Sequence, residues 1–117
     1  MKVVITGSRH IDDDQLVRDV VEESGFEVDE VVSGGASGID VSGEHYAKDN
    51  KLGLTYFPAR WYEFGKAAGP IRNKLMAEYA DALIAIWDGD SRGTRNMIEQ
   101  MEKLEKPIYI KNILGKD

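Results

Sequence analysis

Five short runs rich in β-branched and other apolar residues alternate with longer segments in which apolar residues recur every three or four positions. This alternation is typical of βαβ units, in which each helix returns the chain so that successive strands lie parallel. The pattern predicts strands at Val3–Thr6, Glu30–Ser33, Gly53–Phe57, Ala82–Trp87 and Pro107–Ile110. It predicts helices at Asp13–Ser24, Ile39–Asn50, Ile71–Tyr79 and Thr94–Leu104.

We therefore expect a single Rossmann-like, doubly wound α/β domain over residues 1–117, with a mainly parallel five-stranded sheet and helices on both faces. The length suits one domain and leaves no room for a second. Because crossovers between parallel strands are right-handed, the strand order can reverse near the first strand. Ligands of such folds bind outside the carboxyl ends of the strands, so the turns at those ends are the candidate functional segments.

Composition excludes several classes of protein. The chain has no cysteine, which excludes disulfides, thiolate zinc sites and cysteine nucleophiles. It has no apolar run of the ~18 residues that a membrane span needs, so we expect no membrane partner. The run Met1–Thr6 is typical of a strand rather than of a signal peptide. The expected location is the cytoplasm.

Charge is distributed unevenly along the sequence. The net charge of −6 makes nucleic acid the least favoured partner. Five of the six arginines nevertheless fall in or beside the turns at one predicted edge of the sheet, namely Arg9, Arg60, Arg72, Arg92 and Arg95. This clustering favours a local anion site on an acidic body. The alternative is that these arginines are only solvated.

A glycine-rich turn follows the second predicted strand and opens a helix. Glycines there let the backbone approach a ligand, and free amide groups at a helix start favour a phosphate. The spacing matches neither the dinucleotide fingerprint nor the P-loop, so neither binding mode is predicted, and a tight turn without a ligand remains the alternative. The candidate binding residues are Gly34, Gly35, Ala36, Ser37, Gly38 and Asp40.

Two further turns have the same character. The segment after the fourth strand combines hydroxyl groups with a helix start and offers Ser91, Arg92, Gly93 and Thr94. The turn after the first strand offers Gly7, Ser8 and Arg9. Three such turns at one edge predict a shared site for a nucleotide or sugar-phosphate.

The segment Ala59–Pro70 breaks both helical and strand periodicity, so we expect a long loop, and loops of that length are usually functional. Trp61 or Tyr62 could stack on a base, and Lys66 could meet a phosphate. The alternative is that these aromatic rings plug the end of the third strand as core. Pro70 is expected to start the next helix, and the cations in its first turns, with Asn73 between them, oppose the helix dipole unless an anion is bound.

No metal site or cofactor is predicted, because His10 and His45 lack metal-ligand spacing and the carboxylates are scattered. Asp40 is expected to cap or orient its turn. Glu44 and Glu99 lie a turn or more into helices, where surface residues are usual.

The motifs together resemble the YspA and YpsA-related SLOG family, which is distantly similar to LOG phosphoribohydrolases and to DprA. The resemblance covers most of the chain, and its most specific strings are Gly69–Asn73 and Ser91–Thr94. It implies a Rossmann-like fold that binds nucleotides or nucleotide-derived ligands.

The LOG enzymes hydrolyse the N-glycosidic bond of nucleoside monophosphates, using an arginine at a helix start and a glutamate three residues after a Gly-Thr pair. By this resemblance, Arg72 with Met76 matches the first element, with Asn73 where lysine is usual. The glutamate position is Met97, which can neither move a proton nor stabilise an oxocarbenium-like transition state. The resemblance thus favours binding over hydrolysis.

Three functions follow, in order of preference. The first is binding of a nucleotide or an ADP-ribose-like ligand as a sensor, carrier or sequestering module. The second is an N-glycoside hydrolase in which Asp40 or Glu99 replaces the missing glutamate, and the third is binding of single-stranded DNA. A homo-oligomer is compatible with each. For the first function, Arg72→Ala and Arg92→Ala are each expected to weaken binding by roughly 1.5–3 kcal/mol.

Overall fold

The computed structural model describes residues 1–113 and contains an all-parallel sheet of five strands in the order β3-β2-β1-β4-β5. The strands are β1 (Lys2–Gly7), β2 (Glu30–Ser33), β3 (Gly53–Tyr56), β4 (Ala82–Trp87) and β5 (Ile108–Asn112). The chain moves outward from β1 to β3, then returns to the other side of β1 for β4 and β5. The predicted reversal of strand order near the first strand is therefore confirmed.

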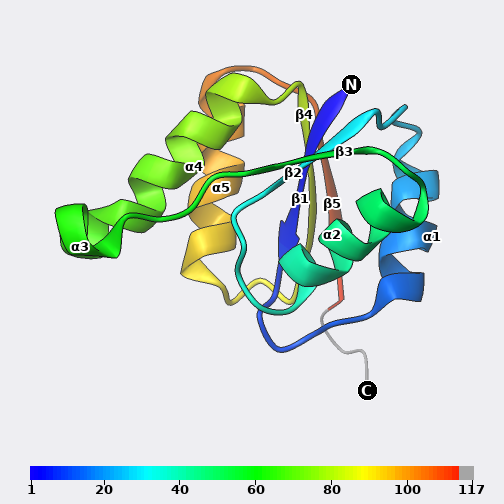
Figure 1. Ribbon diagram of the computed structural model, residues 1–117, viewed down its shortest axis with the longest axis horizontal. Coiled ribbons are helices and arrows are strands. Elements are labelled where there is room, and N and C mark those ends of the chain that lie inside the picture. The colour runs from blue at the N-terminus through cyan, green and yellow to red at the C-terminus, as the bar shows by residue number, and fades with distance from the viewer. Residues whose placement is uncertain (114–117) are drawn as a thin grey trace.

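Helices cover both faces of the sheet (Figure 1). On one face lie α1 (Asp14–Ser24) and α2 (Ile39–Asp49), and on the other lie α4 (Ala68–Tyr79) and α5 (Arg92–Lys103). All six residues of β4 are buried, as expected for a central strand that packs against helices on both sides. This arrangement confirms the predicted doubly wound α/β fold.

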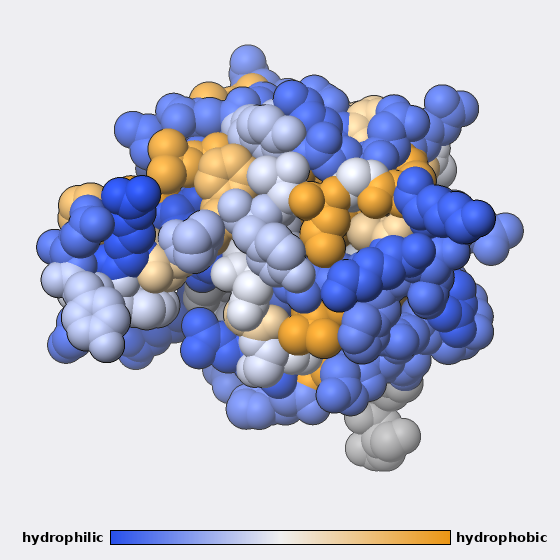
Figure 2. All heavy atoms as spheres, in the orientation of Figure 1, coloured by the Kyte–Doolittle hydropathy of each residue, from blue (hydrophilic) through white to orange (hydrophobic). Residues whose placement is uncertain are grey.

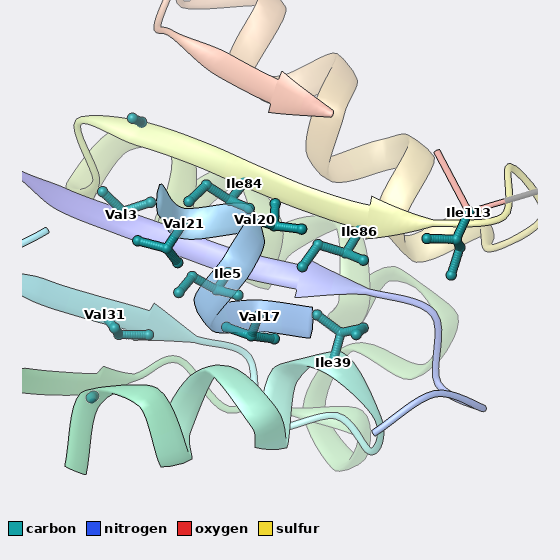
Figure 3. Close-up of a cluster of buried hydrophobic side chains, with 12 residues drawn as sticks. Val3, Ile5, Val17, Val20, Val21, Val31, Ile39, Ile84, Ile86 and Ile113 are labelled. Atoms are coloured by element: carbon teal, nitrogen blue, oxygen red, sulfur yellow. The ribbon is translucent and has the colours of Figure 1, made fainter. Parts of the chain in front are cut away.

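Two hydrophobic clusters hold these layers together. Figure 3 shows the first, in which Val17, Val20 and Val21 of α1 meet Ile5 of β1 and Ile84 of β4. The second joins β1 and β4 to the methionine-rich inner faces of α4 and α5, with Met76, Met97 and Met101 all nearly or fully buried. Alternate residues of one strand thus point into different clusters, which is the period of two expected in a sheet.

The segment predicted as a long loop is largely helical, so this prediction is wrong. It holds the single-turn helix α3 (Trp61–Phe64), the 3₁₀ turn η1 (Gly65–Ala67) and the first residues of α4. Pro70 lies in the third helical position of α4, where a missing N–H costs nothing because the first turn has no intrahelical acceptors for it. In Figure 1, α3 lies at the outer end of α4, away from the sheet.

The aromatic rings of α3 are not core. Trp61 is 54% exposed and Tyr62 fully so, while Phe64 is 44% exposed, which contradicts the alternative that they plug the end of β3. Helix α5 also begins earlier than predicted, at Arg92, because the Ser91 hydroxyl accepts the Thr94 amide N–H at 3.2 Å and caps the helix there. No helix within residues 1–113 is long and apolar enough to cross a membrane.

Candidate functional site

The three glycine-containing turns meet at the carboxyl edge of the sheet, which is the lower edge in Figure 1. They are the β1–α1, β2–α2 and β4–α5 connections. Direct bonds join them: the Ile39 amide donates to the Ser8 carbonyl at 3.2 Å, and the Asp88 amide donates to Ser8 Oγ at 3.3 Å. Ser8, which is 2% exposed, thus links all three turns.

Gly38 is required where the β2–α2 turn crosses the β1–α1 turn. Its φ of +79° is in the left-handed region, and a Cβ there would lie 2.3 Å from the Ser8 carbonyl oxygen. Only a glycine fits both the conformation and the space. This close approach is what places the Gly34–Ser37 backbone beside Arg9.

Three backbone amides of the β2–α2 turn already have hydrogen-bond acceptors within the protein. The Gly35 N–H donates to Ser33 Oγ at 3.0 Å, the Ala36 N–H donates to Asp40 Oδ2 at 3.2 Å, and the Ile39 N–H is taken by Ser8. The expectation that free amides of this turn face a ligand is therefore wrong for these three residues. The β2–α2 turn therefore contributes shape to the site, and the positive charge there comes from arginine side chains.

Asp40 orients the turn, as predicted. Its side chain is 3% exposed, and it accepts hydrogen bonds from Thr6 Oγ1 at 2.7 Å and from the Ala36 amide. Burial raises the pKa of the Asp40 carboxyl above its usual range, while the two hydrogen bonds and the charge of Arg72 act in the opposite direction. Both carboxylate oxygens have partners.

Glu44 is buried at 9% exposure, which corrects the expectation of a surface residue. One carboxylate oxygen accepts from Ser33 Oγ at 2.7 Å, and the other accepts from the Tyr56 hydroxyl at 2.9 Å. Ser33 in turn accepts the Gly35 amide. Glu44 therefore connects the end of β3 to the β2–α2 turn through a single carboxylate.

Arg72 reaches from α4 to the same turn. Its Nη1 donates to the Gly34 carbonyl at 2.6 Å and its Nε donates to Asn73 Oδ1 at 3.0 Å. Asn73 is 4% exposed and donates to the Gly93 carbonyl and to Asn96, so it sits between α4 and α5 and orients Arg72. Asn73, predicted to bind the ligand, lines neither the cavity described below nor its adjoining recess, and its hydrogen bonds position Arg72.

Two guanidinium groups repel each other at this edge. Burial lowers the pKa of Arg72, the neighbouring positive charge of Arg9 lowers it further, and Asp40 opposes both. Arginine stays protonated at neutral pH despite such shifts. Among residues 1–113, neither Arg9 nor Arg72 forms a salt bridge, and the buried Asp40 offsets only part of their positive charge.

A cavity of about 480 Å³ opens at this pair. Its walls are the β2–α2 turn, the end of β3 and the start of α3, and Arg9 and Arg72 both line it. A volume of this size suits a small organic ligand. The lining residues are Arg9, Gly34, Gly35, Ala36, Ser37, Tyr56, Pro58, Ala59, Trp61 and Arg72.

A smaller recess of about 20 Å³ adjoins this cavity and shares Arg9, Ala36 and Arg72 with it. It reaches Asp40 at one side and the first turn of α5 at the other. Its remaining lining residues are Thr6, Gly7, Met76, Ser91, Gly93 and Thr94. The cavity and the recess together bring most of the candidate residues onto one surface.

Other candidates lie elsewhere. Lys66, Arg92 and Glu99 are exposed and line neither the cavity nor the recess. Arg95 donates to the Gly89 carbonyl at 3.1 Å and lies over the Trp87 ring, so it holds the β4–α5 turn. Of the two arginines predicted to weaken binding when replaced, Arg72 lines the cavity and Arg92 does not.

Sequence reasoning missed Tyr56, Pro58 and Ala59 as lining residues. Tyr56 is 50% exposed at the carboxyl end of β3, a position that could have signalled a role at the edge. On the other side of the β3–α3 connection lies an apolar groove of about 350 Å³, lined by Phe64, Ile71 and Leu75 among others. Figure 2 shows hydrophobic side chains over α4 in this view.

Comparison with solved structures finds the fold in DNA processing protein A (DprA) from Streptococcus pneumoniae, with a TM-score of 0.74 and 19% sequence identity. The match covers 93% of this chain and 49% of the DprA chain, so this chain spans about half the length of that protein. No curated protein matches.

The family comparison gives a direct result. The model of the YspA, cpYpsA-related SLOG family (YAcAr) matches residues 1–64, which is more than half of the chain and includes β1, the β2–α2 turn and α3. The chain therefore belongs to the YspA, cpYpsA-related SLOG family.

Proposed function

We propose that this chain binds a nucleotide or a nucleotide-derived, ADP-ribose-like ligand in the carboxyl-edge cavity, as a sensor, carrier or sequestering module. The observation that supports this most is the convergence of Arg9 and Arg72 on one cavity, where neither guanidinium forms a salt bridge within residues 1–113. A phosphate between two guanidinium groups relieves their repulsion and forms charge-assisted hydrogen bonds. The aromatic side chains of Tyr56 and Trp61 on the same cavity suit a base or another planar group.

Binding without hydrolysis fits the acidic residues better than a LOG-like N-glycosidase does. Both carboxylate oxygens of Asp40 already accept hydrogen bonds, from the Thr6 hydroxyl and the Ala36 amide. Glu99 lies on an exposed helix face. Met97, at the position of the LOG glutamate, is 1% exposed and belongs to the hydrophobic cluster under α5. Within residues 1–113, no carboxylate lines the cavity, and Asp40, which lines the adjoining recess, has both oxygens bonded.

Calorimetry with ADP-ribose, AMP and ribose 5-phosphate tests the proposal. Arg9→Ala and Arg72→Ala are each expected to weaken binding by roughly 1.5–3 kcal/mol, the range for hydrogen bonds to charged groups. Because Arg72 also holds the Gly34 carbonyl, the exposed Arg9 gives the cleaner comparison.

Arg18→Ala is the matched control, since Arg18 lies on α1 and its guanidinium donates to Gln15. The proposal fails if none of these ligands binds, or if Arg9→Ala and Arg72→Ala both bind as the wild type does. Chromatography of the same mixtures would detect released base, and base release would replace binding with hydrolysis as the function.

A further inference from the structure

We infer that Tyr56 makes the cavity selective for bases that carry an amino group, such as adenine and cytosine, over their keto counterparts hypoxanthine and uracil. This inference rests on the proposed function and adds a specificity-determining residue to it. It depends on how the Tyr56 hydroxyl is held rather than on the arginine pair.

The hydroxyl group of Tyr56 has a fixed partner. It donates to Glu44 at 2.9 Å, and Glu44 is held on its other oxygen by Ser33 at 2.7 Å. Glu44 is buried, whereas Tyr56 is half-exposed and lines the cavity. Of the two partners in this hydrogen bond, the carboxylate is thus the more deeply buried.

A hydroxyl group has one proton to donate and two lone pairs that accept. With its proton committed to Glu44, the Tyr56 oxygen can only accept a hydrogen bond from a ligand. The hydrogen bond to Glu44 also raises the pKa of the Tyr56 phenol, so this proton stays in place at neutral pH. The negative charge of Glu44 further favours a donor and disfavours a second acceptor at this oxygen.

Bases differ at just this point. The exocyclic amine of adenine or cytosine is a donor, whereas the keto oxygen at the same ring position of hypoxanthine or uracil is an acceptor. A keto oxygen placed beside Tyr56 would meet the phenol oxygen, and because both atoms are acceptors, no hydrogen bond would form. Since Arg9 and Arg72 line the same cavity, a nucleotide with its phosphate on the arginines has its base available to Tyr56.

The test compares pairs that differ in one group. AMP is expected to bind about tenfold more tightly than IMP, and CMP about tenfold more tightly than UMP, which corresponds to one hydrogen bond between neutral groups at the upper end of its usual range. N6,N6-dimethyl-AMP, which keeps the adenine ring but has no amine hydrogen, is expected to bind as weakly as IMP. This last comparison uses the wild-type chain alone and does not depend on a variant folding.

Tyr56→Phe removes only the hydroxyl and is expected to bring both ratios close to one. Tyr109→Phe is the matched control, because the Tyr109 hydroxyl also donates to a carboxylate, Glu23, at 3.0 Å, but lies on β5 and lines no part of the cavity. It should leave both ratios as in the wild type. This control shows whether the effect requires a tyrosine hydroxyl in the cavity or follows from the loss of any tyrosine–carboxylate hydrogen bond.

The possible results are distinct. If ADP-ribose binds but AMP and IMP bind equally, or if Tyr56→Phe keeps the wild-type ratios, the inference about Tyr56 is wrong and the proposed function stands. If neither ADP-ribose nor any of the mononucleotides binds, the proposed function fails and the inference fails with it.

Discussion

The two edges of the sheet use charged groups in opposite ways. At the amino edge, the Met1 ammonium pairs with Asp29 at 2.6 Å, and the Lys106 ammonium donates to three main-chain carbonyls near the end of α4. At the carboxyl edge, Arg72 donates to the Gly34 carbonyl, but it lines one cavity together with Arg9, and neither arginine forms a salt bridge within residues 1–113. The two cations at the amino edge thus serve contacts within the chain alone, whereas two arginines at the carboxyl edge also line a cavity that suits an anion.

The asymmetry follows from the parallel sheet. Each helix that returns the chain ends at the amino edge, so its last carbonyls gather there and attract cations such as Lys106. Each helix begins at the carboxyl edge, where the N-terminal dipole favours anions and opposes cations. Arginine side chains at the carboxyl edge are therefore unfavourable unless an anion binds beside them. For this reason we assign the charged groups of the amino edge to fold stability and those of the carboxyl edge to ligand binding.

The largest expected effect compares one glycine at each edge. Gly38 and Gly25 both have a positive φ, of +79° and +74°, but a Cβ on Gly38 would meet the Ser8 carbonyl while one on Gly25 would meet nothing within 4 Å. We expect Gly38→Ala to lower the free energy of unfolding by about 3 kcal/mol, through clash and backbone strain. Gly25→Ala should cost only about 1 kcal/mol, from backbone conformation alone. Equal losses in urea denaturation would show that the turns do not cross tightly.

A smaller effect is expected at the amino edge. Lys106→Met removes three hydrogen bonds to carbonyls of Ala77, Glu78 and Ala80, and should lower the free energy of unfolding by about 1.5–3 kcal/mol. Affinity for a ligand at the carboxyl edge should not change. Lys103→Met, at an exposed position in the last turn of α5, is the control and should cost at most about 0.5 kcal/mol. A loss of ligand affinity in Lys106→Met would contradict the claim that charged groups at the amino edge contribute to stability and not to binding.

The smallest effect concerns pH and the buried carboxyl of Asp40. Because the pKa of Asp40 is raised in the folded state, the folded protein takes up this proton at a higher pH than the unfolded chain does. The charged form therefore lowers the free energy of unfolding at neutral pH, and this penalty disappears as the pH falls through the raised pKa.

Asp40→Asn isolates this contribution. An asparagine oxygen can accept the Ala36 amide while its NH₂ group donates to Thr6, so the turn keeps its bonds. The free energy of unfolding of the wild type, measured relative to Asp40→Asn, should rise as the pH is lowered from 7 toward about 4, the ordinary pKa of an aspartate. A fall over the same interval would mean that the charged carboxylate stabilises the fold.

Much of the architecture could be predicted from local pattern. The ranges Glu30–Ser33 and Ala82–Trp87 match β2 and β4 because buried parallel strands read as continuous apolar runs bounded by polar turns. The edge that gathers the three turns follows from parallel topology. The helical character of residues 61–69 escaped prediction, because Gly65, Gly69 and Pro70 are typical of loops and α3 buries no residue to impose a period.

The site was predicted less completely, for reasons of packing. Glu44 is buried because α2 lies very close to β1: a Cβ on Gly43 would be 2.9 Å from Ile5. No sequence period reveals such an approach, and so the Glu44–Tyr56 bond could not be foreseen, although the position of Tyr56 at the end of β3 pointed to the edge. Arg72 and Arg92 are similar in sequence context, yet only the former is turned by Asn73 toward the cavity.

The central claim is that a phosphorylated ligand binds at the carboxyl edge of the sheet. The most direct measurement is a titration of ¹⁵N-labelled protein with ADP-ribose, in which the NMR chemical shifts of the backbone amides are recorded along the chain. We predict the largest shifts at Arg9, within Gly34–Ser37 and at Tyr56, with the amides around Met1, Ala80 and Lys106 unmoved. Shifts centred on the amino edge, or saturating shifts that leave the Gly34–Ser37 turn unaffected, would contradict the account.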